Sequence, residues 1–66
     1  MNLQEGHWYR GKSGKPRYIE RIDEYVSCDA VYYHVLGSGR RRWCWDPGFR
    51  RWAVDDLGTE EPEGDK

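Results

Sequence analysis

The chain has 66 residues, of which 36% are hydrophobic and 15% are aromatic, and its formal net charge at pH 7 is −1. A chain of this length forms one domain and buries roughly 60% of the surface of its unfolded form, so large side chains must fill its core. No stretch approaches the roughly 18 apolar residues of a membrane span, and residues 1–6 lack the basic start and apolar run of a secretion signal. We therefore expect a soluble, cytoplasmic protein.

The charges are divided unevenly along the chain. Up to Val54, ten basic residues stand against six acidic ones, a net charge of +4, whereas from Asp55 onward six acidic residues stand against Lys66 alone, a net charge of −5. A basic body with an acidic end fits either an anion-binding surface screened by its own terminus or a solubilising tail. Because residues 55–66 hold almost no apolar side chain, we expect them to be a disordered acidic tail.

The first third of the chain predicts a flexible lead-in and two strands. Residues 1–5 form the lead-in, and His7–Arg10 is a short β-prone run. A loop with two glycines and one proline, Gly11–Pro16, separates this run from Arg17–Asp23. The two isoleucines of Arg17–Asp23 are three positions apart, which is a helical spacing, but the run is too short for a helix. We therefore predict a strand with an irregularity.

The clearest strand of the sequence is Asp29–Leu36, a continuous β-branched and aromatic run. Alternation places Val31, Tyr33 and Val35 on one face. The other face carries Ala30, Tyr32, His34 and Leu36. Both faces carry apolar groups, which is typical of a central strand, and Gly37–Gly39 predicts a hairpin turn because glycine adopts the positive φ of such turns.

The next strand is expected over Arg40–Trp45. Alternation places Arg41, Trp43 and Trp45 on one face, and the other face carries Arg40, Arg42 and Cys44. The sequence Asp46-Pro47-Gly48 ends the strand, because proline cannot donate a hydrogen bond to a strand ladder.

The last elements are a helical turn and a brief strand. Phe49–Trp52 follows the Asp-Pro-Gly sequence with apolar residues three apart, so we predict one short helical turn with Asp46 as its N-cap. Ala53 and Val54 are expected to form the closing strand. The fold prediction is thus all-β, with four or five antiparallel strands over residues 6–54 and one short helical turn before the last strand.

This order of elements is similar to that of the small SH3-like β-barrels, in which a single helical turn precedes the closing strand. The resemblance covers residues 6–54 and includes the aromatic opening Gly6–Arg10 and the late turn Phe49–Trp52. Small proteins of bacterial or phage origin have this pattern, and the resemblance implies a closed barrel and an accessory or inhibitory protein. The Ala-Leu-Tyr-Asp-Tyr signature of eukaryotic SH3 domains is absent, so binding of proline-rich peptides is not implied.

The residues that bind metals or act as nucleophiles are poorly spaced. His7, Cys28, His34 and Cys44 lack the Cys-x₂₋₄-Cys and His-x₃₋₅-His spacings of zinc sites, so we predict no metal site. A catalytic triad would need Cys28 and His34 together with Asp29, but six residues along a strand separate Cys28 from His34 by about 20 Å. We expect reduced, buried cysteines, no cofactor and no enzymatic activity.

Aromatic and basic residues gather between positions 40 and 54. Tryptophan, tyrosine and arginine dominate the hot spots of protein interfaces, so the sequence predicts a non-catalytic module that recognises a protein partner. The alternative is single-stranded nucleic-acid binding by the same face, because rings that stack on bases beside phosphate-neutralising arginines hold single strands on small barrels. Of the three tryptophans, some are expected in the core and the exposed ones in the site. The candidate binding residues are Arg40, Arg42, Trp43, Trp45, Arg50, Arg51 and Trp52.

Overall fold

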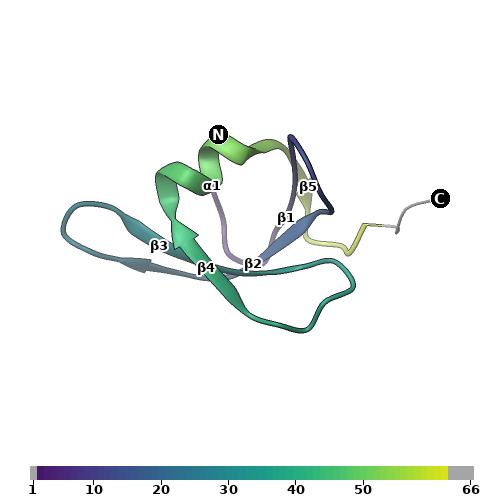
Figure 1. The fold of residues 1–66 in the computed structure, drawn as a ribbon, viewed down its shortest axis with the longest axis horizontal. Coiled ribbons are helices and arrows are strands. Elements are labelled where there is room, and N and C mark those ends of the chain that lie inside the picture. The colour runs from purple at the N-terminus through teal and green to yellow at the C-terminus, as the bar shows by residue number, and fades with distance from the viewer. Residues whose placement is uncertain (1, 63–66) are drawn as a thin grey trace.

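Residues 2–62 are described by the computed structural model (Figure 1). Five strands and one helix follow one another along this part of the chain. They are β1 (Trp8–Gly11), β2 (Arg17–Glu24), β3 (Asp29–Val35), β4 (Arg42–Trp45), α1 (Asp46–Trp52) and β5 (Ala53–Gly58). The predicted all-β fold, with a short helix before the last strand, is confirmed.

The five strands form one antiparallel sheet in the order β4-β3-β2-β1-β5. β4 and β5 are the two edges of this sheet and do not pair with each other, so the prediction of a closed barrel is wrong. The reason is α1, which crosses the opening between the two edge strands and contacts β3, β4 and β5 (Figure 1). The helix fills the space in which β4 and β5 would have to meet.

The irregularity predicted in the second strand is a bulge between Ile19 and Arg21. Ile19 is opposite Tyr33 on β3, and Ile22 is opposite Val31. Because the bulge inserts one extra residue, both isoleucines face the core although they are three positions apart. A helical spacing is therefore compatible with a strand here.

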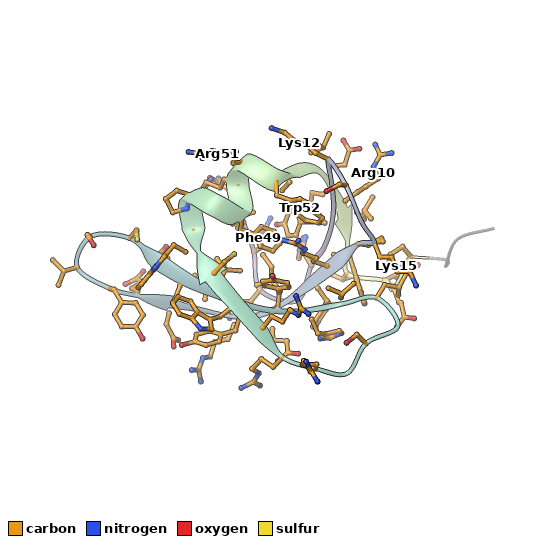
Figure 2. All side chains as sticks on the ribbon, in the orientation of Figure 1. Arg10, Lys12, Lys15, Phe49, Arg51 and Trp52 are labelled. Carbon is orange, nitrogen blue, oxygen red and sulfur yellow. The ribbon has the colours of Figure 1, made fainter. Side chains whose placement is uncertain are left out.

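The core lies between one face of the sheet and α1. The aromatic ring of Phe49 is fully buried, with edge-to-face contacts to Tyr9, Tyr33 and Trp52 at centroid distances of 5.8, 5.5 and 5.4 Å. Figure 2 shows Phe49 and Trp52 on α1 above the sheet. Such aromatic pairs add about 0.5–1.5 kcal/mol each to the hydrophobic contribution of burial. One side chain of α1 therefore anchors the helix to the sheet.

The start of α1 differs from the prediction in its cap. The N-cap residue is Trp45, whose side chain makes no capping hydrogen bond, and Asp46 is the first residue of the helix. The Asp46 carboxylate instead accepts a hydrogen bond from Nε of Arg50, one turn further on, at 2.8 Å. Asp46 therefore stabilises the helix by its charge in the first turn and by an i, i+4 ion pair.

Segments near both ends of the described chain are held to the sheet. Residues 1–5 were predicted to be a flexible lead-in, but Gln4 N–H donates to the Tyr9 hydroxyl at 2.9 Å and the Glu5 carboxylate accepts from Ile22 N–H at 2.8 Å. β5 continues to Gly58, so the predicted exit from the sheet after Val54 is wrong by four residues. Of the rest of the predicted tail, residues 59–62 follow β5 without helix or strand, and residues 63–66 lie outside the described residues. Within residues 2–62, no helix has the length and apolar character needed to cross a bilayer.

Candidate binding surface

The face of the sheet opposite the core, called the outer face here, carries an exposed group of aromatic rings. Alternation in β3 and β4 turns Tyr32, Trp43 and Trp45 to this face, since their neighbours Val31, Tyr33 and Cys44 pack in the core. Tyr25, from the turn between β2 and β3, joins them. These four residues, Tyr25, Tyr32, Trp43 and Trp45, are called the aromatic patch.

The rings of the aromatic patch form an unbroken series of contacts. Tyr25 meets Trp45 at a centroid distance of 5.7 Å, Trp45 meets Trp43 at 5.0 Å, and Trp43 meets Tyr32 at 6.5 Å. Trp43, Trp45 and Tyr25 nevertheless remain 52%, 46% and 54% exposed. Contiguous exposed rings of this kind mark interaction surfaces more often than isolated apolar residues do.

The charged groups beside the aromatic patch are paired with one another. Arg21 lies over the Tyr32 ring at 5.0 Å and its guanidinium contacts the Asp23 carboxylate at 2.9 Å. Arg41 donates from Nε to Glu20 at 2.8 Å. The two guanidinium groups on this surface are therefore each paired with a carboxylate.

Glu20 also contacts His34, which belongs to a second group of aromatic residues on the outer face. One carboxylate oxygen of Glu20 contacts Nδ1 of His34 at 2.6 Å, and the His34 ring packs against Trp8 and Tyr18 at centroid distances of 5.6 and 5.2 Å. The pKa of Glu20 is lowered, chiefly by the hydrogen bond with His34 and then by that with Arg41. Trp8 is only 4% exposed, so this second group is part of the folded scaffold.

The predicted site residues divide between two surfaces. Trp43 and Trp45 lie together in the aromatic patch. Arg40 and Arg42 are exposed near the start of β4, and Arg42 is opposite Tyr33 on the core side of the strand. The remaining three residues, Arg50, Arg51 and Trp52, lie on α1, away from the outer face. The prediction of one continuous aromatic and basic face is thus not met.

Trp52 is largely a scaffold residue. Its Nε1–H donates to the Ser13 carbonyl at 2.8 Å, and the Arg17 guanidinium lies over its ring at 4.0 Å. Tyr25, Tyr32 and Arg21, by contrast, belong to the outer face and were not among the predicted site residues. The signal for Tyr32 was present in the sequence, because alternation turns it away from Val31 and Tyr33.

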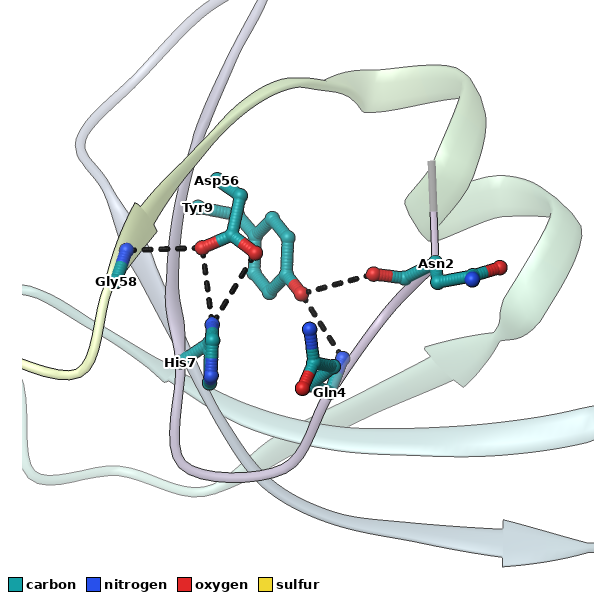
Figure 3. A network of polar contacts seen from close by, with 6 residues as sticks. All are labelled: Asn2, Gln4, His7, Tyr9, Asp56 and Gly58. Carbon is teal, nitrogen blue, oxygen red and sulfur yellow. Dashed lines mark hydrogen bonds and ion pairs between the residues drawn. The ribbon is translucent and has the colours of Figure 1, made fainter.

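The histidines and cysteines lie in separate places. His7 Nδ1 contacts the two carboxylate oxygens of Asp56 at 3.0 and 3.1 Å, and Gly58 N–H donates to the same carboxylate at 2.8 Å (Figure 3). Cys28 and Cys44 are free thiols, and burial raises the pKa of Cys44. Among residues 2–62, no three histidine, cysteine or acidic side chains are grouped as metal ligands.

Comparison of the chain with protein-family models, with curated proteins and with solved structures gave no match.

Proposed function

We propose that this protein is a non-catalytic binding module that recognises a protein partner through the aromatic patch. The single observation that carries the proposal is the series of contacting rings from Tyr25 to Tyr32 on the outer face, in which Tyr25, Trp43 and Trp45 are exposed. Tryptophan and tyrosine supply large, rigid contact areas and dominate the energetics of protein interfaces. Arg21, stacked on Tyr32, adds an arginine to the same surface.

The alternative, single-stranded nucleic-acid binding by this face, has weaker support. Binding of a single strand combines stacked bases with cations that neutralise phosphates. The guanidinium groups of Arg21 and Arg41 are already paired with Asp23 and Glu20, so these carboxylates would have to be displaced or would repel phosphate. An aromatic surface whose arginines are already paired suits a protein partner better.

The position of the patch at an edge of the sheet favours an extended partner segment. Trp43 and Trp45 belong to β4, which within residues 2–62 pairs only with β3. A partner strand added to the free edge of β4 would place its side chains next to both indoles. Backbone hydrogen bonds would then supply affinity, and the indoles would supply selectivity. A small accessory or inhibitory protein acting on a larger assembly is in keeping with this mode.

The proposal is tested by comparing two double variants in affinity capture from extracts of the source cells, with quantitative mass spectrometry as the readout. Trp43→Ala/Trp45→Ala removes the two indoles. Val54→Ala/Leu57→Ala is the matched control, because it truncates two exposed apolar residues on β5, the other edge of the sheet. A partner bound by the patch is expected with the wild type and the control and lost by at least tenfold with the indole variant. Equal capture by all three proteins would contradict the proposal.

A further inference from the structure

A second charged surface lies at the end of the molecule formed by the β1–β2 loop and the C-terminal half of α1. Lys12 and Lys15 come from the loop and Arg51 from the helix, and all three side chains are exposed. Figure 2 shows them pointing outward, with Arg10 beside the loop. Lys12, Lys15 and Arg51 are called the basic ridge.

The fold fixes the loop against the helix. Lys12 N–H donates to the Trp52 carbonyl at 2.9 Å, and Trp52 Nε1–H donates to the Ser13 carbonyl at 2.8 Å. Gly11 touches the indole so closely that no Cβ would fit between them. Two hydrogen bonds and one close contact therefore hold Lys12 next to the end of α1 that carries Arg51.

The basic ridge differs from the outer face in its charge balance. Residues 10–17 and 46–55 together contain six basic and two acidic residues, a net charge of +4. The two acidic residues, Asp46 and Asp55, are paired with Arg50 and Arg10. Within residues 2–62, the cations of the ridge have no ion-pair partner, so they are available to an external anion.

Trp52, the aromatic residue at this end, is not available to stack on the bases of a ligand, whereas the rings of the aromatic patch are. The Trp52 ring already contacts the Arg17 guanidinium, the Gly11 backbone and Phe49. A ligand of the basic ridge is therefore held by charge and not by stacking of its bases. Spaced cations without an exposed ring suit the regular phosphates of a nucleic-acid backbone, which bind lysine and arginine with release of counterions.

We propose that the basic ridge binds the phosphate backbone of a nucleic acid without stacking of its bases. This site is separate from the aromatic patch and does not depend on the proposed protein partner. Because a duplex carries the denser charge, it is bound at least as tightly as a single strand.

The test is fluorescence anisotropy with a labelled 20-base-pair DNA duplex and labelled dT20, from 25 to 200 mM KCl. Three phosphate contacts predict a slope of about −2.7 in log K against log salt for the duplex. Lys12→Ala/Arg51→Ala is expected to weaken duplex binding at least tenfold at 50 mM KCl and to flatten the slope by about 1.8. Arg40→Ala/Arg42→Ala is the matched control, since it removes two exposed cations elsewhere and makes the same change in net charge. It is expected to weaken binding less than threefold.

Three results would overturn the proposal. The first is no duplex binding at 25 mM KCl, and the second is equal weakening by the two double variants, which would mean a response to net charge alone. The third is tighter binding of dT20 than of the duplex, because it would require stacked bases. Circular dichroism of each variant excludes misfolding as the cause of lost binding. An alanine at position 12 still donates its backbone N–H to the Trp52 carbonyl.

Discussion

The indole of Trp52 lies directly against the backbone of Gly11, and a Cβ at Gly11 would be 1.8 Å from Cε2 of the indole. This contact joins α1 to the last residue of β1, which is 41 positions earlier in the chain. The Trp52 ring also contacts Phe49 and the Arg17 guanidinium, so it has little room to move away. The contact explains why position 11 needs a residue without a side chain.

Gly11→Ala is therefore expected to destabilise the protein. Forcing a methyl group into this contact should cost about 2 kcal/mol or more, since overpacking typically costs 1–3 kcal/mol. For a domain of this size, this corresponds to a fall in Tm of roughly 10 °C, measured by circular dichroism.

Gly48→Ala is the control for this substitution. Gly48 lies within α1, its φ is not positive, and nothing lies within 4 Å of an added Cβ. Alanine is expected to raise the unfolding free energy by up to about 1 kcal/mol there, because glycine is a poor helix former. Similar Tm values for the two alanine variants would disprove the close contact at position 11.

The two groups of aromatic residues are expected to differ in their effects on stability. Phe49→Ala should cost about 3–5 kcal/mol, because it leaves a cavity among Tyr9, Tyr33 and Trp52. Trp43→Ala should cost no more than about 1.5 kcal/mol, since the indole is half exposed and loses mainly its contacts with Trp45 and Tyr32. Urea unfolding followed by circular dichroism measures both values. A larger loss for Trp43 than for Phe49 would make the aromatic patch structural.

The alternation of side chains in the strands could be predicted from the sequence, because a strand has a fixed period of two. Val31, Tyr33 and Cys44 lie in the core as their positions indicated, and Trp43 and Trp45 lie together on the opposite face. Alternation does not predict that Trp43 and Trp45 lie on a different surface from the residues of α1. The helix leaves the plane of the sheet after Trp45, so neighbours in the sequence end on different sides of the molecule.

The predicted end of the sheet at Val54 is wrong because the partners of β5 are distant in the sequence. Asp55 and Asp56 belong to an acidic segment whose composition indicates disorder. In the fold, Asp55 pairs with Arg10 and Asp56 contacts His7, which are 45 and 49 positions away. Local composition carries no information about such long-range pairs.

Removal of residues 55–66 is accordingly expected to destabilise the protein strongly. The deletion removes most of β5 and its pairing with β1, including the partners Arg10–Asp55 and Trp8–Gly58. We expect a fall in Tm of more than 10 °C in a thermal scan. Removal of residues 59–66 leaves β5 intact and should lower Tm by only a few degrees. Equal Tm values for the intact chain and the longer deletion would show that β5 adds nothing to stability.

The contact between His7 and Asp56 is expected to make the free energy of unfolding fall at acidic pH. The pKa of Asp56 is lowered, chiefly by the hydrogen bond with His7 and then by the one that Gly58 N–H donates.

A carboxyl group whose pKa is lower in the folded state stabilises the fold above its unfolded pKa, about 3.9 for aspartate, and this contribution is lost as pH falls through the folded value. At pH 6, Asp56→Asn should therefore lower the unfolding free energy by about 1 kcal/mol, because the two hydrogen bonds to the carboxylate are partly exposed to solvent. Urea unfolding between pH 6 and 2.5 should show this difference shrinking below pH 4, while Glu61→Gln, at a position without an ion pair in residues 2–62, should follow the wild type throughout. A difference between Asp56→Asn and the wild type that stays constant down to pH 2.5 would mean that the Asp56 charge does not stabilise the fold.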